Sequence, residues 1–101
     1  MITRMWKGWT RTELADVYDQ HYRTEVLEGL RGVPGFAGAR LLQRVVGDEV
    51  EFVSLTYFDD LESIRSFAGP DYEAAVVAEP ARKVLTRFEE TVAHYETSFA
   101  T

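Results

Sequence analysis

The sequence ARLLQRVVGDEVEFVSLTYFDD, residues 39–60, decides the fold of this chain. Two apolar runs flank Gly47–Asp48, and glycine at the first position of a two-residue loop suits a type II′ turn, where that residue needs a positive φ. With this loop Arg44 lies opposite Glu51 as an oppositely charged cross-strand pair, and a slip of one residue would lose both features. The sequence therefore predicts a β-hairpin, whose other pairs are Val46 with Glu49, Leu42 with Val53 and Leu41 with Ser54.

A strand and a helix precede the hairpin. Residues 2–9 are rich in aromatic and β-prone side chains, which indicates a first strand. Thr10 and Glu13 have the spacing of a capping box, so we expect a helix to begin at Thr10, and Gly32 with Pro34 ends it. Its apolar stripe at helical spacing consists of Leu14, Val17, Tyr18, His21, Tyr22, Val26 and Leu30.

Two helical segments, a turn and a last strand follow the hairpin. A cap at Asp59 or Asp60 and a break at Gly69 bound a helix over residues 61–68. The remaining predicted elements are a helical turn capped by Asp71 over residues 71–77, a helix that begins at Pro80 and covers residues 80–88, and a strand over residues 89–99.

The predicted order, β-α-β-β-α-β, is the ferredoxin-like α+β arrangement, in one domain spanning residues 1–101. Its antiparallel sheet carries helices on one face, so the other face should be polar. Both faces of the hairpin are apolar instead. We therefore expect a homodimer that packs sheet against sheet through the face of Leu42, Val46, Val53, Leu55 and Tyr57.

Composition excludes several classes of function. Seventeen acidic and eleven basic residues give a net charge of −6 without any basic run, which argues against nucleic acid and anionic membranes as partners. The absence of cysteine excludes disulfides, thiolate nucleophiles and zinc–sulfur sites. No apolar run has the length of a signal peptide core or a membrane span, so a cytoplasmic protein is expected.

Four stretches of the chain form a recognisable set: MITRMWKGWT at the start, VPGF before the second strand, EFVSLTYFDDLESIRSFAG from the third strand into the next helix, and HYE in the last strand. Together they resemble the antibiotic biosynthesis monooxygenase-like family over nearly the whole chain. The resemblance implies a dimeric α+β barrel with a pocket between sheet and helices in each protomer. Some members oxidise aromatic polyketide quinols with molecular oxygen and without metal or flavin, others bind and degrade haem, and many have no known reaction. No cofactor is therefore expected.

Few functional residues carry over from the resemblance. Quinol-oxidising and haem-degrading members use an asparagine in or near the first strand, and this chain contains no asparagine. Where they have a tryptophan at the junction of third strand and second helix, this chain has Tyr57 and Phe58. Haem-degrading members take a histidine after that junction, and no histidine lies between His21 and His94. Haem degradation of that kind is not expected.

His21 and Tyr72 are the predicted catalytic residues. His21 falls on the apolar stripe of the first helix, where a histidine can act as a general base toward a phenol or an acidic C–H. The alternative is a core histidine bonded to a carbonyl or a tyrosine. Tyr72 follows the Gly–Pro break, in a segment suited to a flap over the pocket, and its alternative role is to cap a helix.

Aromatic side chains beside small hydroxyls suit a planar aromatic ligand, although aromatic residues on a sheet usually belong to the core. Two histidines without cysteine make a weak set of metal ligands, so no metal site is predicted. For His94 the alternatives are a place in the pocket and a structural place between sheets. The predicted substrate-binding residues are Trp6, Tyr22, Phe52, Ser54, Phe67 and His94.

The sequence and the resemblance favour a cofactor-independent monooxygenase acting on a small aromatic or polyketide-derived substrate. In that mechanism His21 or another base deprotonates a phenol, and the electron-rich anion reacts with oxygen in a dry aromatic pocket. Two alternatives remain open: a non-catalytic small-ligand-binding or stress-associated dimer, and an isomerase or cyclase that uses the same base without oxygen.

Overall fold

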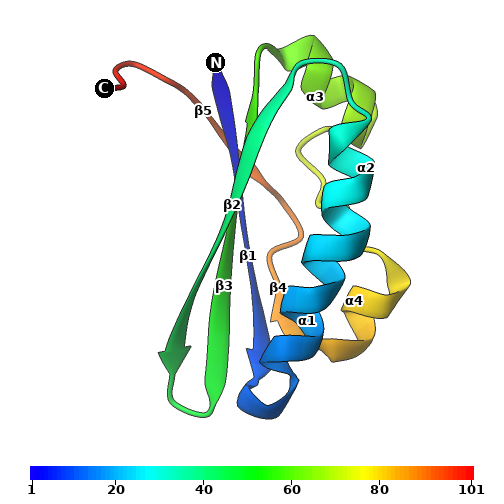
Figure 1. Ribbon diagram of the computed structural model, residues 1–101, viewed down its shortest axis with the longest axis vertical. Coiled ribbons are helices and arrows are strands. Elements are labelled where there is room, and N and C mark those ends of the chain that lie inside the picture. The colour runs from blue at the N-terminus through cyan, green and yellow to red at the C-terminus, as the bar shows by residue number, and fades with distance from the viewer.

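The computed structural model describes residues 1–101 and contains one antiparallel sheet. Strand β1 (Ile2–Arg11) lies in its centre, with β3 (Glu49–Phe58) on one side and β2 (Phe36–Val46) beyond it. On the other side, β4 (Leu85–Phe88) and β5 (Ala93–Glu96) pair with opposite ends of β1. The predicted ferredoxin-like α+β fold is confirmed, with the fourth strand position divided between two short strands (Figure 1).

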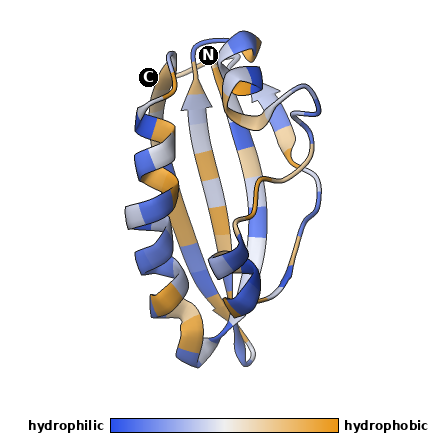
Figure 2. Ribbon diagram, turned by 90° about the vertical axis from the view of Figure 1, so that its right-hand side faces the viewer, coloured by the Kyte–Doolittle hydropathy of each residue, from blue (hydrophilic) through white to orange (hydrophobic).

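All helical segments pack on one face of the sheet, as Figures 1 and 2 show. We call this the inner face and the opposite one the outer face. The helical segments are η1 (Thr12–Leu14), α1 (Ala15–His21), η2 (Tyr22–Val26), α2 (Leu27–Arg31), α3 (Leu61–Ala68) and α4 (Glu79–Val84).

Two locally encoded predictions are confirmed. Gly47 has φ +63 at the tip of the hairpin, and every predicted pair is found in the β2–β3 register. Arg44 Nε lies 2.6 Å from Glu51 Oε2 across the two strands. At α3, the Asp60 carboxylate accepts the backbone N–H three residues on at 2.9 Å, and Gly69 ends the helix with φ +87.

The predicted helix start at Thr10 is wrong, because β1 continues to Arg11. Thr10 pairs with Val50 and is fully buried. The helical region begins at Thr12 with a 3₁₀ turn that has no side-chain cap. Since β3 starts at Glu49, it offers ladder hydrogen bonds to the last residues of β1, and these satisfy the backbone in place of a local cap.

The first helical region contains a π turn, η2, between α1 and α2. Tyr18, Tyr22 and Leu30 of the predicted stripe are buried, as expected. Val17 is 51% exposed, so its assignment to the stripe is wrong. The cause is geometric: Tyr18 faces the sheet, and its chain neighbour points about 100° away from it around the helix.

The helical turn predicted over residues 71–77 is found only in part: the Ala74 N–H donates to the Asp71 carbonyl at 3.1 Å in a single turn, and residues 75–78 are not helical. Ala74 forms a β-bridge with Thr91, and the Val92 N–H donates to the Glu73 carbonyl at 2.8 Å. After that turn, nonlocal bonds satisfy the backbone groups that a continuing helix would have paired locally. We call residues 71–78, which run beside the β4–β5 connection, the strap.

The predicted helix over residues 80–88 ends early, and the predicted strand over 89–99 is shortened. The helix stops at Val84, and the chain continues as β4 along β1. After a break it pairs with β1 again as β5. The edge of β1 opposite β3 is free to accept a strand, and pairing there overrides local helix propensity.

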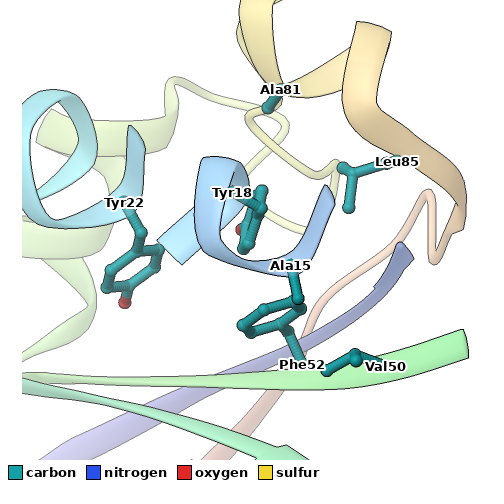
Figure 3. Close-up of a cluster of buried hydrophobic side chains, with 7 residues drawn as sticks. All are labelled: Ala15, Tyr18, Tyr22, Val50, Phe52, Ala81 and Leu85. Atoms are coloured by element: carbon teal, nitrogen blue, oxygen red, sulfur yellow. The ribbon is translucent and has the colours of Figure 1, made fainter. Parts of the chain in front are cut away.

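Two clusters of buried apolar side chains hold the helices on the inner face. The larger contains Phe52 beneath Tyr18, with ring centroids 4.8 Å apart (Figure 3). The smaller is centred on Leu30, Phe58 and Ile64, all without exposed surface. Full burial of such side chains contributes about 1.5–3 kcal/mol each, which fixes the helical layer against the sheet.

The outer face is apolar in its centre and carries no helix (Figure 1). The register turns Met5, Val53 and Leu55 to this face, and Leu42 beside them is 48% exposed. The predicted apolar character of both sheet faces is therefore confirmed.

Candidate functional site

A pocket opens between the inner face of the sheet and the helical layer. Its cavity volume is about 60 Å³, and the free space rises to about 540 Å³ when the open mouth is counted. Strands β1 and β3, the helical segments α1, η2, α3 and α4, the end of the strap and the β4–β5 connection contribute to its wall. The lining residues are Arg4, Trp6, Tyr18, His21, Tyr22, Val26, Ser54, Thr56, Phe67, Val76, Val77, Ala78, Ala81 and Val92. The wall therefore has one arginine, one histidine and no carboxylate.

His21 is the last residue of α1 and lines the pocket. Its Nε2 atom is buried and has no hydrogen-bond partner, and the Tyr18 ring lies beside it with centroids 6.2 Å apart. Buried polar side-chain atoms are normally paired, so this unpaired ring nitrogen is an exception within the pocket wall. The π turn begins at the next residue, and such turns are frequent at functional sites.

Two tyrosines enter the pocket wall from the helical region. The Tyr22 hydroxyl and the Ser54 Oγ atom are 2.8 Å apart, and Figure 3 shows the Tyr22 ring directed toward the sheet. Burial raises the pKa of Tyr22, and burial followed by the proximity of Tyr22 raises the pKa of Tyr18. Both side chains are therefore neutral phenols near pH 7, able to donate a hydrogen bond.

Arg4 is the cation of the pocket, and the sequence analysis missed it. Only 5% of this residue is exposed. Its guanidinium donates to the carbonyls of Tyr72 and Ala74 and to Nε2 of His94, but to no carboxylate. Burial lowers the pKa of Arg4 to about 10. The sequence contained a signal for this residue, since Arg4 lies two residues before Trp6 in the first strand and therefore shares its inward face.

The predicted site residues occupy three different places. Five of them share the pocket wall: His21, Trp6, Tyr22, Ser54 and Phe67. Phe52 has no exposed surface and lies in the core under Tyr18. Tyr72 and His94 are outside the wall, behind Arg4.

Tyr72 and His94 form a pair that backs the guanidinium of Arg4. Their rings meet edge to face with centroids 5.3 Å apart, and His94 Nε2 lies 2.9 Å from Arg4 Nη1. Burial, and then the charge of Arg4, lower the pKa of His94. The neutral imidazole therefore accepts a hydrogen bond from Arg4.

Taken together, the wall offers the imidazole of His21, two phenol hydroxyls and one cation, with Trp6 and Phe67 as aromatic surfaces. No group of three or more metal-ligating side chains occurs in the structure. None of its helices has the length and apolar character needed to cross a bilayer. The arrangement suits a small aromatic molecule that gives up a proton.

No protein-family model matches this sequence, and no curated protein matches it significantly. Solved structures do match. A putative antibiotic biosynthesis monooxygenase from Nitrosomonas europaea superimposes with a TM-score of 0.71 at 10% identity, over 98% of this chain and 100% of that one. SnoaB, a cofactor-independent oxygenase from Streptomyces nogalater, gives 0.69 at 14% identity over 98% and 95%.

A third similar structure is the haem degrader MhuD from Mycobacterium tuberculosis, solved with two haems in its active site. It gives a TM-score of 0.67 at 19% identity and covers 100% of this chain and 99% of that one. At these identities the similarity concerns the fold. The chain therefore has the fold of the antibiotic biosynthesis monooxygenase-like proteins.

Proposed function

We propose that this protein is a cofactor-independent monooxygenase acting on a small aromatic or polyketide-derived substrate. The observation that carries the proposal is the buried, unpaired Nε2 atom of His21 in an aromatic pocket wall. A base placed there can accept a proton from a phenol or from an activated C–H group. Because the wall is largely apolar, it excludes water from the anion that results.

The chemistry needs only the substrate, oxygen and a base. Deprotonation by His21 gives an electron-rich carbanion or phenolate, which transfers electrons to oxygen and then forms a carbon–oxygen bond. For an anthrone, two C–H bonds break, one oxygen atom becomes the new carbonyl, and the other leaves as water with the two hydrogens. The substrate thus supplies all the electrons. The similar fold of the cofactor-independent oxygenase SnoaB supports this reaction class.

Oxygen uptake with a panel of anthrone- and quinol-type phenols tests the proposal. We expect saturable uptake by the wild type and its loss in His21→Ala, whereas Gln20→Ala, an exposed change on the same helix, should keep the wild-type rate. Uptake at the buffer rate with every phenol would refute the oxygenase. Turnover that continues without oxygen would identify an isomerase or cyclase, and binding without turnover a ligand-binding protein.

We also propose that two copies pack through their outer faces to form a homodimer. The support is the apolar outer face, where Leu42, Val46 and Tyr95 are 48%, 44% and 54% exposed. Large contiguous apolar patches on soluble proteins usually mark an interaction surface. A twofold contact would use the same patch on both copies and bury it without any additional chain.

Sedimentation velocity at micromolar concentration checks the dimer. The wild type should sediment with twice the mass of one chain, and Leu42→Glu should shift it toward the monomer. Val45→Glu is the matched control, because Val45 lies on the same strand, faces the other way and is 71% exposed. A wild type that sediments only as a monomer would contradict the proposal.

A further inference from the structure

We propose that the pocket binds an aromatic ligand that carries a carboxylate, with the guanidinium of Arg4 as the counter-ion. This inference rests on the proposed function in placing the ligand beside His21, so the expected substrate is an aromatic hydroxy acid. Its hydroxyl would face the base and its carboxylate the cation.

The first argument is that Arg4 is buried without an anionic partner. The five ion pairs of the protein all involve other residues. Arg4 is 5% exposed, and the pocket wall contains no aspartate or glutamate. A buried charge is costly unless it is paired, so a lone guanidinium in a pocket wall is suited to pairing with a charge that a ligand brings.

The second argument is the number of free donors on the guanidinium. Arginine has five N–H groups. On Arg4 three of them serve the Tyr72 carbonyl, the Ala74 carbonyl and His94. The Nε–H and one Nη2–H remain, and two neighbouring N–H groups are what a carboxylate accepts in a bidentate pair.

The third argument is the surface next to this cation. The Phe67 ring centroid lies 5.8 Å from the Arg4 guanidinium carbon, and both residues line the pocket. The Trp6 side chain, two residues along β1, lines it as well. A flat aromatic ring can therefore lie against apolar walls while its acid group meets the guanidinium.

Arg4 also holds the strap through the carbonyls of Tyr72 and Ala74, and a purely structural role would explain those bonds. The two roles differ in what they predict for ligand charge. A structural clamp affects charged and neutral ligands alike. A counter-ion strengthens the binding of the charged ligand only. Because the net charge of the protein is −6 and opposes the binding of an anion, a preference for the acid requires a local cation.

Isothermal titration calorimetry with 2-naphthoate and its methyl ester tests the proposal, because esterification removes the charge of the acid group and adds only one methyl group. We expect the wild type to bind the acid at least about tenfold more tightly than the ester. Arg4→Gln should lose this preference and still bind the ester with near wild-type affinity. The matched control, Arg82→Gln, removes an exposed arginine that donates to the Val77 carbonyl of the strap, and it should keep the preference.

Three outcomes would overturn the proposal: no preference for the acid in the wild type, a preference that survives in Arg4→Gln, or equal weakening of both probes in Arg4→Gln. If Arg4→Gln does not fold, Arg4→Lys takes its place. Arg4→Lys keeps the charge but not the two-donor edge, so it should weaken binding of the acid and leave binding of the ester unchanged.

These titrations require no turnover. A protein that prefers the acid but consumes no oxygen would therefore refute the proposed monooxygenase activity and leave this inference intact. Oxygen uptake that is equal for acidic and neutral phenols, without any preference for the acid in binding, would support the monooxygenase and refute the counter-ion role of Arg4.

Discussion

Truncation of Phe52 should cost stability and leave the ligand site largely intact. Phe52 has no exposed surface, and its ring centroid lies 4.8 Å from that of Tyr18. Phe52→Ala removes a fully buried ring from a packed core, which costs about 3–5 kcal/mol. With a slope of roughly 1–3 kcal/mol per molar urea, the unfolding midpoint should fall by at least about 1 M, while the slope stays unchanged.

The conservative variant Phe52→Leu makes a test of binding possible, since it should lose only about 1–2 kcal/mol and remain folded. We expect its affinity for 2-naphthoate to equal that of the wild type. Phe67 gives the opposite pattern because it is half-buried, lines the pocket and contacts Arg4. Phe67→Leu should therefore weaken naphthoate binding by about two- to fivefold, with a smaller change in the urea midpoint.

Urea denaturation followed by tryptophan fluorescence, together with calorimetry on the same four proteins, measures both quantities. The reasoning is refuted if Phe52→Leu weakens binding more than Phe67→Leu does, because Phe52 would then reach the ligand. It is also refuted if Phe52→Ala lowers the midpoint by less than Phe67→Leu.

Three further changes probe a helix cap, a turn and a helix interior. Asp60→Ala should lower the urea midpoint at pH 7, because hydrogen bonds from Ser63 lower the pKa of the Asp60 carboxyl, and the charged cap therefore stabilises the fold above its unfolded pKa. The difference in urea midpoint between Asp60→Ala and the wild type should narrow as the pH falls below about 4. A difference that stays constant down to pH 2 would contradict a stabilising role of the charged cap. Gly35→Ala should destabilise by at least about 1–3 kcal/mol, since Gly35 has φ +87 and an added Cβ would lie 2.0 Å from Ser63 Oγ. Gly29→Ala, a helical site where the added Cβ would meet no atom within 4 Å outside its own helix backbone, should instead raise the free energy of unfolding by about 0.5–1 kcal/mol.

The sequence by itself determined those features that a few neighbouring residues encode. The hairpin follows from Gly47 and from the Arg44–Glu51 pair, and α3 follows from its cap at Asp60 and its break at Gly69. Strand alternation alone placed Trp6 on one face of β1, and the apolar character of both hairpin faces was equally plain. These signals are short-range, so they keep their meaning before any tertiary contact forms.

Only the tertiary structure decided which segments meet across long sequence distances. Thr10 belongs to a strand because Val50, forty residues on, supplies its partner, and the chain after Val84 is extended because β1 has a free edge. The setting of Arg4 depends in the same way on the strap and on His94. Whether a polar group is buried, paired or free depends on the segments that pack around it, and no local pattern contains that information. The sequence therefore predicted the frame of the pocket, while the folded chain decided that a lone cation and an unpaired imidazole nitrogen share its wall.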